Sequence, residues 1–128
     1  MHRSALGDLL IDVDPETHDR ELEFWQHATG STLRPLGDAG AHTRLKGSWS
    51  TVAFTMQRLG EGGSRVHFDV MTDDVAAETA RLEALGAERE RSMDGWEIMR
   101  DPAGLVFCVI PAAFVGVTLT DENSVAWD

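Results

Sequence analysis

Apolar and polar residues largely alternate in two short stretches of the chain that match each other, LLIDVD at residues 9–14 and VHFDVM at residues 66–71. Such alternation predicts strands that bury one face. Each stretch is followed by a segment with apolar residues at helical spacing, at 15–30 and 72–87, and a glycine stands at or near the end of each segment. A strand and a helix therefore occur twice in the same order, which indicates an internal repeat.

Each predicted helix leads into three short extended segments separated by turn residues. Their ranges are 31–36, 41–46 and 51–58 in the first half of the chain, and 87–91, 96–100 and 105–110 in the second. Both halves are therefore predicted to be βαβββ modules, joined by the polar GEGGS stretch. The prediction is one domain, residues 1–128, made of module one at 5–59, a linker at 60–64, module two at 65–111 and a C-terminal tail at 112–128. The FVGVTL stretch of the tail is compatible with an edge strand, a dimer arm or a partly ordered terminus.

Side chains alternate across a strand, so the pattern also predicts which residues share a face. The apolar residues of VHFDVM should face the helix of module two, which turns His67 and Asp69 to the other side. By the repeat, Leu10 and Asp12 lie on the corresponding face of module one. The predicted fold class is α+β, with two βαβββ modules forming a curved mixed sheet around a cleft and with the helices on the outer face.

His67 is the residue with the widest choice of chemistry, because an unperturbed imidazole titrates near neutral pH. Three interpretations are open: a histidine satisfied by a neighbouring group, a general acid or base assisted by Asp69 or Asp12, and a metal ligand. A carboxylate beside a histidine can fix its tautomer, but the two aspartates are equally compatible with pairing to arginine or water. The sequence alone does not choose between these interpretations.

A possible ligand lining comes from the last strand of module one, where Trp49, Thr55 and Gln57 share one parity. Trp96 is the corresponding candidate in module two. Aromatic and amide side chains suit a planar organic ligand, whereas the alternative is that the tryptophans are ordinary core or interface residues. Cys108 is the chain's single cysteine and is flanked by apolar residues, which is typical of an inert buried thiol.

Charge and composition exclude several classes of function. Eleven Lys and Arg against twenty-two Asp and Glu give a formal charge of −11, which repels nucleic acid and anionic membranes. No apolar run approaches the roughly 20 residues of a membrane helix, and no secretory signal is recognisable, so a soluble cytoplasmic protein is expected. His42, Arg44 and Lys46 alternate on a predicted strand. They indicate either a solvated basic edge or a contact for an anionic substrate.

Two stretches carry a resemblance to a known family: RVHFDVMTDDVAAETARLEALGA and GWEIMRDPAGLVFCVIP resemble the vicinal oxygen chelate superfamily, in its glyoxalase-like and bleomycin-resistance branch. The resemblance implies a cleft that holds a divalent metal or an organic ligand. It places the metal-ligand positions at Leu10, Thr55, His67 and Cys108. Leucine cannot coordinate and threonine is a poor donor to a divalent ion, so no metal cofactor is expected.

The resemblance implies a glyoxalase-like or bleomycin-resistance-like protein that binds a small organic molecule in its cleft without metal. The alternative is a lyase or isomerase of the same superfamily that uses His67 as general acid or base. A metal-dependent glyoxalase or dioxygenase would need ligands that the chain lacks. The expected partners are a small organic molecule and a second copy of the chain, because the apolar tail and the strand edges favour a homodimer.

Overall fold

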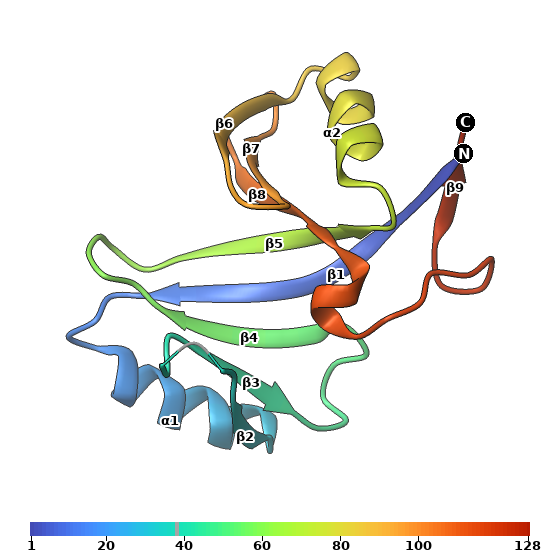
Figure 1. Cartoon of the computed structure of the whole chain (residues 1–128). Helices are drawn as coiled ribbons and strands as arrows, with labels where there is room; N and C mark the ends of the chain where they lie inside the picture. The colour runs from blue at the N-terminus through green and yellow to red at the C-terminus, as the bar shows by residue number, and fades with distance from the viewer. Residues whose placement is uncertain (38) are drawn as a thin grey trace. The chain divides into compact units, whose positions relative to one another are not determined.

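The computed structural model describes residues 1–37 and 39–128, and both modules have the predicted order of elements (Figure 1). Module one consists of β1 (His2–Val13), α1 (His18–Thr29), β2 (Thr32–Pro35), β3 (His42–Lys46) and β4 (Ala53–Arg58). Module two consists of β5 (Arg65–Thr72), α2 (Val75–Ala84), β6 (Glu88–Ser92), β7 (Glu97–Arg100) and β8 (Val106–Pro111). A 3₁₀ helix, η1 (Ala112–Val115), and a short strand, β9 (Val125–Trp127), follow. In the described part of the chain, no helix combines the length and the apolar character needed to cross a membrane.

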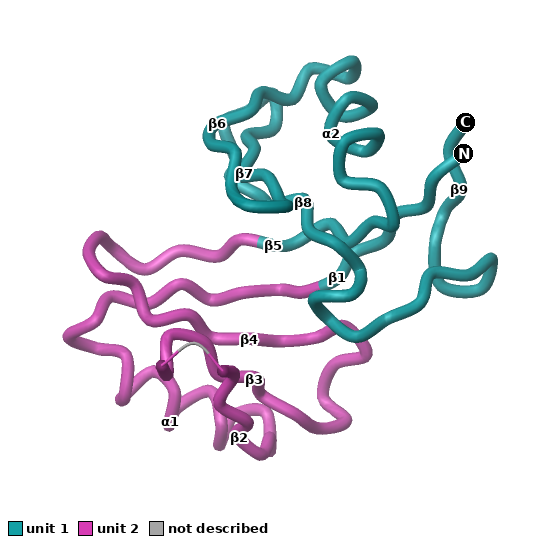
Figure 2. The backbone as a smooth tube through the Cα atoms, in the orientation of Figure 1, with its two compact units in different colours: residues 1–7, 68–128 teal, residues 8–67 magenta. Residues whose placement is uncertain are grey.

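The chain divides into two compact units, residues 8–67 and residues 1–7 with 68–128 (Figure 2). In the first of these, β2, β3 and β4 pair in antiparallel order and β4 pairs with β1 in parallel. The side chains of Ile11 and Val13 lie on the face that α1 covers, where they pack with Leu22 and Trp25 of the helix and with Phe54 of β4. The alternation predicted for this strand is therefore confirmed.

The unit of residues 1–7 and 68–128 repeats the arrangement, with β5 parallel to β8 and with β8, β7 and β6 antiparallel in that order. Phe68 and Val70 face α2 and pack around Met99 and Val109. The side chain of Asp74 caps α2 by accepting a hydrogen bond from the backbone N–H of Ala77 (3.0 Å). The predicted α+β class, with mixed sheets and a helix on one face of each, is confirmed.

The opposite face of this second sheet is covered by the segment that follows β8. Val115, Val117 and Leu119 pack against a buried cluster that includes Met71 and Cys108. The prediction that residues 114–119 could form an edge strand is wrong: the chain turns through η1, passes Gly116 in the left-handed region at φ 70°, and regains strand structure only in β9. β9 pairs antiparallel with residues 2–4 at the start of β1.

One charged residue, Glu78 of α2, is completely buried at 0% exposure. Arg81 donates two hydrogen bonds of 2.8 Å to its carboxylate, and His2 Nε2 lies 2.7 Å from Oε2. Burial alone would raise the pKa of the Glu78 carboxyl, but the hydrogen bonds from Arg81, His2 and Ser4 together hold the pKa below its ordinary value. Glu78 is therefore ionised at neutral pH and ties α2 to the start of β1.

Candidate active site

A polar group occupies the face of module one that α1 does not cover. Asp8, Leu10 and Asp12 of β1 are all buried there, on the opposite side of the strand from the helix-packing residues. In the parallel pairing of β1 with β4, Thr55 lies opposite Leu10 and Gln57 lies opposite Asp12. The predicted site residues Asp12, Thr55 and Gln57 therefore share one face, and that face carries charge rather than an apolar core.

His67 makes the shortest contact of this group. Its Nδ1 lies 2.6 Å from Oδ2 of Asp12, with His67 at 8% and Asp12 at 1% exposure. Arg65, two residues earlier on β5, places its Nε 3.3 Å from the same carboxylate oxygen. The other carboxylate oxygen, Oδ1, is buried and has no hydrogen-bond partner among the described residues. An imidazole held by a buried carboxylate has a fixed orientation and tautomer, which is the arrangement of a proton-transfer histidine.

Asp8 forms a second buried group four residues before Asp12. The Thr55 hydroxyl donates to its carboxylate, at 2.9 Å from each oxygen, and accepts from Nε of Arg44 at 3.0 Å. Arg44 Nη2 lies 3.4 Å from Oδ2 of Asp8. Burial raises the pKa of the Asp8 carboxyl, although the hydrogen bond from Thr55 and the charge of Arg44 act in the opposite direction.

The raised pKa of Asp8 predicts a specific pH dependence. The folded protein holds the Asp8 proton more tightly than the unfolded chain does, so stability from this group is complete at low pH and is lost as the pH rises above the ordinary aspartate pKa of about 4. In urea unfolding from pH 3.5 to 7, the wild type should lose stability relative to the Asp8→Asn variant over this range. Asp94→Asn, at an exposed turn position, should parallel the wild type. If Asp8→Asn also does so, the pKa of Asp8 is not raised.

The four positions that the family resemblance marks for metal ligands are divided between the two compact units. In residues 8–67, Leu10 has no donor atom and the Thr55 hydroxyl already donates to Asp8. The Nδ1 atom of His67 faces Asp12. In the other unit, Cys108 pairs in register with Asp69.

The two tryptophans predicted to line a ligand cleft differ in their placement. Trp49 is in a bend before β4 and is 58% exposed; its ring centroid is 5.6 Å from that of Phe54, a residue of the face that α1 covers. It therefore does not share a face with Thr55 and Gln57, because β4 begins only at Ala53 and the predicted parity does not extend back to residue 49. Trp96 is partly buried against the Cys108 cluster, among residues of the C-terminal segment.

Sequence reasoning missed three members of the polar group: Asp8, Arg44 and Arg65. Asp8 has the same parity as Asp12, but the strand was predicted to begin at residue 9. For Arg44 the sequence indicates either a solvated basic edge or a contact for an anionic substrate. The first interpretation is wrong, because β3 pairs with both β2 and β4 and is not an edge strand. No signal in the sequence singles out Arg65.

Comparisons with known proteins agree with the fold. Residues 10–110 match the glyoxalase-like domain family, while no curated protein matches the chain. The crystal structure of methylmalonyl-CoA epimerase from Mycobacterium tuberculosis is similar at a TM-score of 0.58 and 16% identity, covering 84% of this chain and 87% of that one. A Streptomyces coelicolor methylmalonyl-CoA epimerase in complex with 2-nitronate-propionyl-CoA has a TM-score of 0.55 at 18% identity, covering 85% and 97%. A mutant of 4-hydroxymandelate synthase from Streptomyces coelicolor has a TM-score of 0.59 at 13% identity, covering 84% and 48%.

At these identities the solved structures establish the fold alone. The match to the glyoxalase-like family extends over most of the chain and takes in both βαβββ modules. The chain therefore belongs to the glyoxalase-like domain family.

Proposed function

We propose that this protein is a glyoxalase-like enzyme that moves a proton on a small organic molecule, as an isomerase or a lyase. His67 is the acid–base group and Asp12 is its positioning residue. The observation that carries the proposal is the 2.6 Å contact between His67 Nδ1 and the buried carboxylate of Asp12. Both reaction types begin with the transfer of a proton to or from the substrate, which a positioned histidine performs near neutral pH.

The geometry assigns the ring nitrogens different tasks. Nδ1 faces Asp12, so the carboxylate holds the proton on that nitrogen and stabilises the imidazolium when it forms. Nε2 is then the atom that takes a proton from the substrate or returns it. Asp69, the other carboxylate considered as a helper for His67, pairs in register with Cys108 of β8. A role for Asp69 in catalysis stays a prediction.

The residues on the polar face of module one favour acid–base chemistry over simple retention of an organic ligand. A pocket that only holds a planar molecule is mostly apolar with a few polar groups. Here Trp49 does not share a face with Thr55 and Gln57. The group on that face, Asp8, Asp12, Thr55, Arg44 and His67, is charged and hydrogen-bonded. Proteins that share the fold include an epimerase, so an isomerase is compatible with the scaffold.

The test is solvent exchange at carbon. The purified protein is incubated in D₂O with a panel of small aldehydes, 2-oxo acids and thioesters, and loss of the proton next to the carbonyl is followed by proton NMR. At least one compound should exchange, and His67→Gln should lower that rate by at least about 100-fold. Equal rates in both proteins would refute the proposal, and a compound that binds without exchange would favour retention of the ligand instead.

A further inference from the structure

The second face of the module-two sheet is covered by a segment of the same unit, which we call the strap and define as residues 112–127. Val115, Val117 and Leu119 of the strap pack on the apolar cluster around Met71 and Cys108. Cys108 is buried beneath it. The strap therefore stands between this face of the sheet and solvent.

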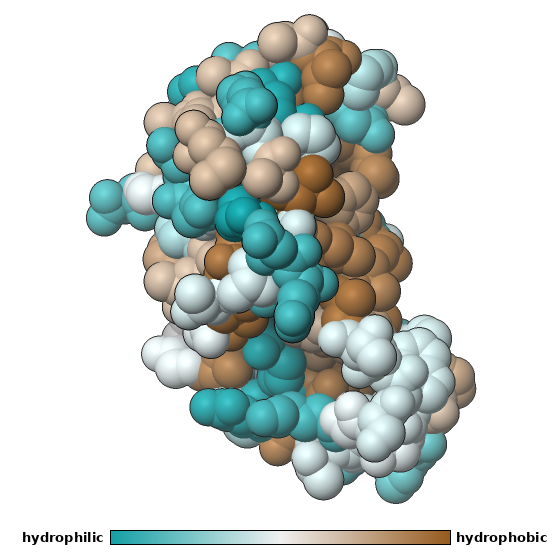
Figure 3. All heavy atoms as spheres, turned by 90° about the vertical axis from the view of Figure 1, so that its right-hand side faces the viewer, coloured by the Kyte–Doolittle hydropathy of each residue, from teal (hydrophilic) through white to brown (hydrophobic). Residues whose placement is uncertain are grey.

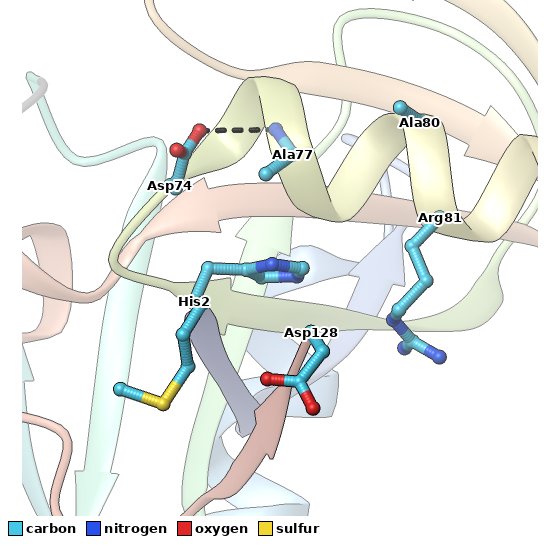
Figure 4. Close-up of a pocket in the computed structure, with 7 residues that line it drawn as sticks. His2, Asp74, Ala77, Ala80, Arg81 and Asp128 are labelled. Carbon is cyan, nitrogen blue, oxygen red and sulfur yellow. Dashed lines mark hydrogen bonds between the residues drawn. The ribbon is translucent and has the colours of Figure 1, made fainter.

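The far end of the strap is fixed by Trp127. Its indole Nε1 donates to the Ser4 hydroxyl at 2.8 Å, and the Arg81 guanidinium carbon lies 3.8 Å from the ring centroid. Arg81 is held in that position by the buried Glu78. Asp128, the next residue, lines a pocket of about 430 Å³ together with His2, Asp74 and Arg81 (Figure 4). Arg81, which contacts the Trp127 ring, therefore also borders open space.

Between its apolar packing on the sheet and its end at β9, the strap contains little regular structure. η1 has four residues and β9 has three, and no regular element lies between them. Apolar residues reach the surface on the side that carries the chain ends (Figure 3), and Phe114 and Val125 of the strap are 60% and 52% exposed. The strap ion pair between Arg3 and Asp121 is exposed on the aspartate side. Segments of this kind open at a lower free energy than the whole domain.

We propose that the strap opens as a unit while the rest of the protein stays folded, with Trp127 as the latch that keeps it shut. Opening exposes the apolar surface around Cys108 and Trp96, which the strap covers when it is closed. The inference rests on contacts within one compact unit and does not depend on the role of His67.

Cys108 serves as the reporter because it is the only cysteine in the chain. Its reaction with 5,5′-dithiobis(2-nitrobenzoate) is measured over a series of low urea concentrations, below the unfolding transition. Local opening makes the wild-type rate nearly independent of urea. Trp127→Ala should raise that rate about tenfold, because the variant loses both the indole hydrogen bond and the contact with Arg81. Trp127→Phe, which keeps an aromatic ring, should lie between the two.

Trp49→Ala is the matched control, since Trp49 is an exposed tryptophan of the other unit, and it should leave the Cys108 rate unchanged. If Trp127→Ala does not fold, Trp127→Phe is used in its place; it removes the indole donor of the hydrogen bond to Ser4 and should raise the rate two- to fivefold, by roughly the worth of one hydrogen bond. The proposal is overturned if wild-type labelling follows global unfolding in its urea dependence. It is also overturned if the latch variants speed labelling only in proportion to their loss of global stability.

Discussion

Replacing Glu78 with glutamine should lower the free energy of unfolding by about 3 kcal/mol, the cost of removing one partner from a buried ion pair. The glutamine fits the same space, so the effect isolates the charge. Glutamine has a single acceptor oxygen, so Arg81 keeps at most one of its two hydrogen bonds, and both Arg81 and the buried His2 lose their contact with a carboxylate. The lowered pKa of Glu78 means that the charge is present in the folded protein at neutral pH. Urea unfolding at pH 7 followed by circular dichroism measures the loss.

Glu83→Gln is the matched control on the same helix. Its carboxylate pairs with Arg89 at 2.5 Å, but both side chains are more than a third exposed. An exposed pair contributes at most about 1 kcal/mol. If the two glutamine variants lose the same stability, Glu78 is not the buried anchor that its 0% exposure indicates.

The sequence predicted the fold wherever polar residues stay out of the core. The alternation in residues 9–14 and 66–71 correctly turned Ile11, Val13, Phe68 and Val70 toward the helices. The same pattern did not predict the first residues of β1 as a buried strand, because the buried side chains there are polar. His2 and Ser4 are buried, and each has a hydrogen-bond partner more than 70 positions away in the sequence. No local sequence pattern predicts such partners.

In the candidate site, too, the sequence does not predict contacts between residues that are distant in the chain. The parity of a strand predicts that Asp12 and His67 share the polar face, but it does not predict which of the two aspartates contacts the imidazole, because that depends on pairing between distant segments. The prediction for Trp49 failed for a related reason. Its predicted orientation assumed a regular strand back to residue 49, and the bend before Ala53 breaks the alternation.

Asp12→Asn should lower the rate of solvent exchange by about 100-fold, within the range that positioned acid–base groups contribute. Asparagine matches the aspartate in size but cannot stabilise the imidazolium, and its amide can offer a donor to Nδ1 where the carboxylate only accepts. The substrate concentration for half-maximal rate should change by less than about threefold, since the contact acts on proton transfer and not on binding. Rates and half-saturation are both read from the deuterium-exchange assay.

Asp14→Asn provides the control for this change, because Asp14 follows β1 directly and its carboxylate accepts from the Glu16 backbone N–H, a bond that asparagine can keep. It should exchange substrate protons at the wild-type rate. An Asp12→Asn variant that loses stability, and in which rate and half-saturation change together, would make the Asp12–His67 contact a packing feature of the polar face. A fall in rate alone, in a variant that unfolds at the wild-type urea concentration, assigns the carboxylate to the positioning of His67.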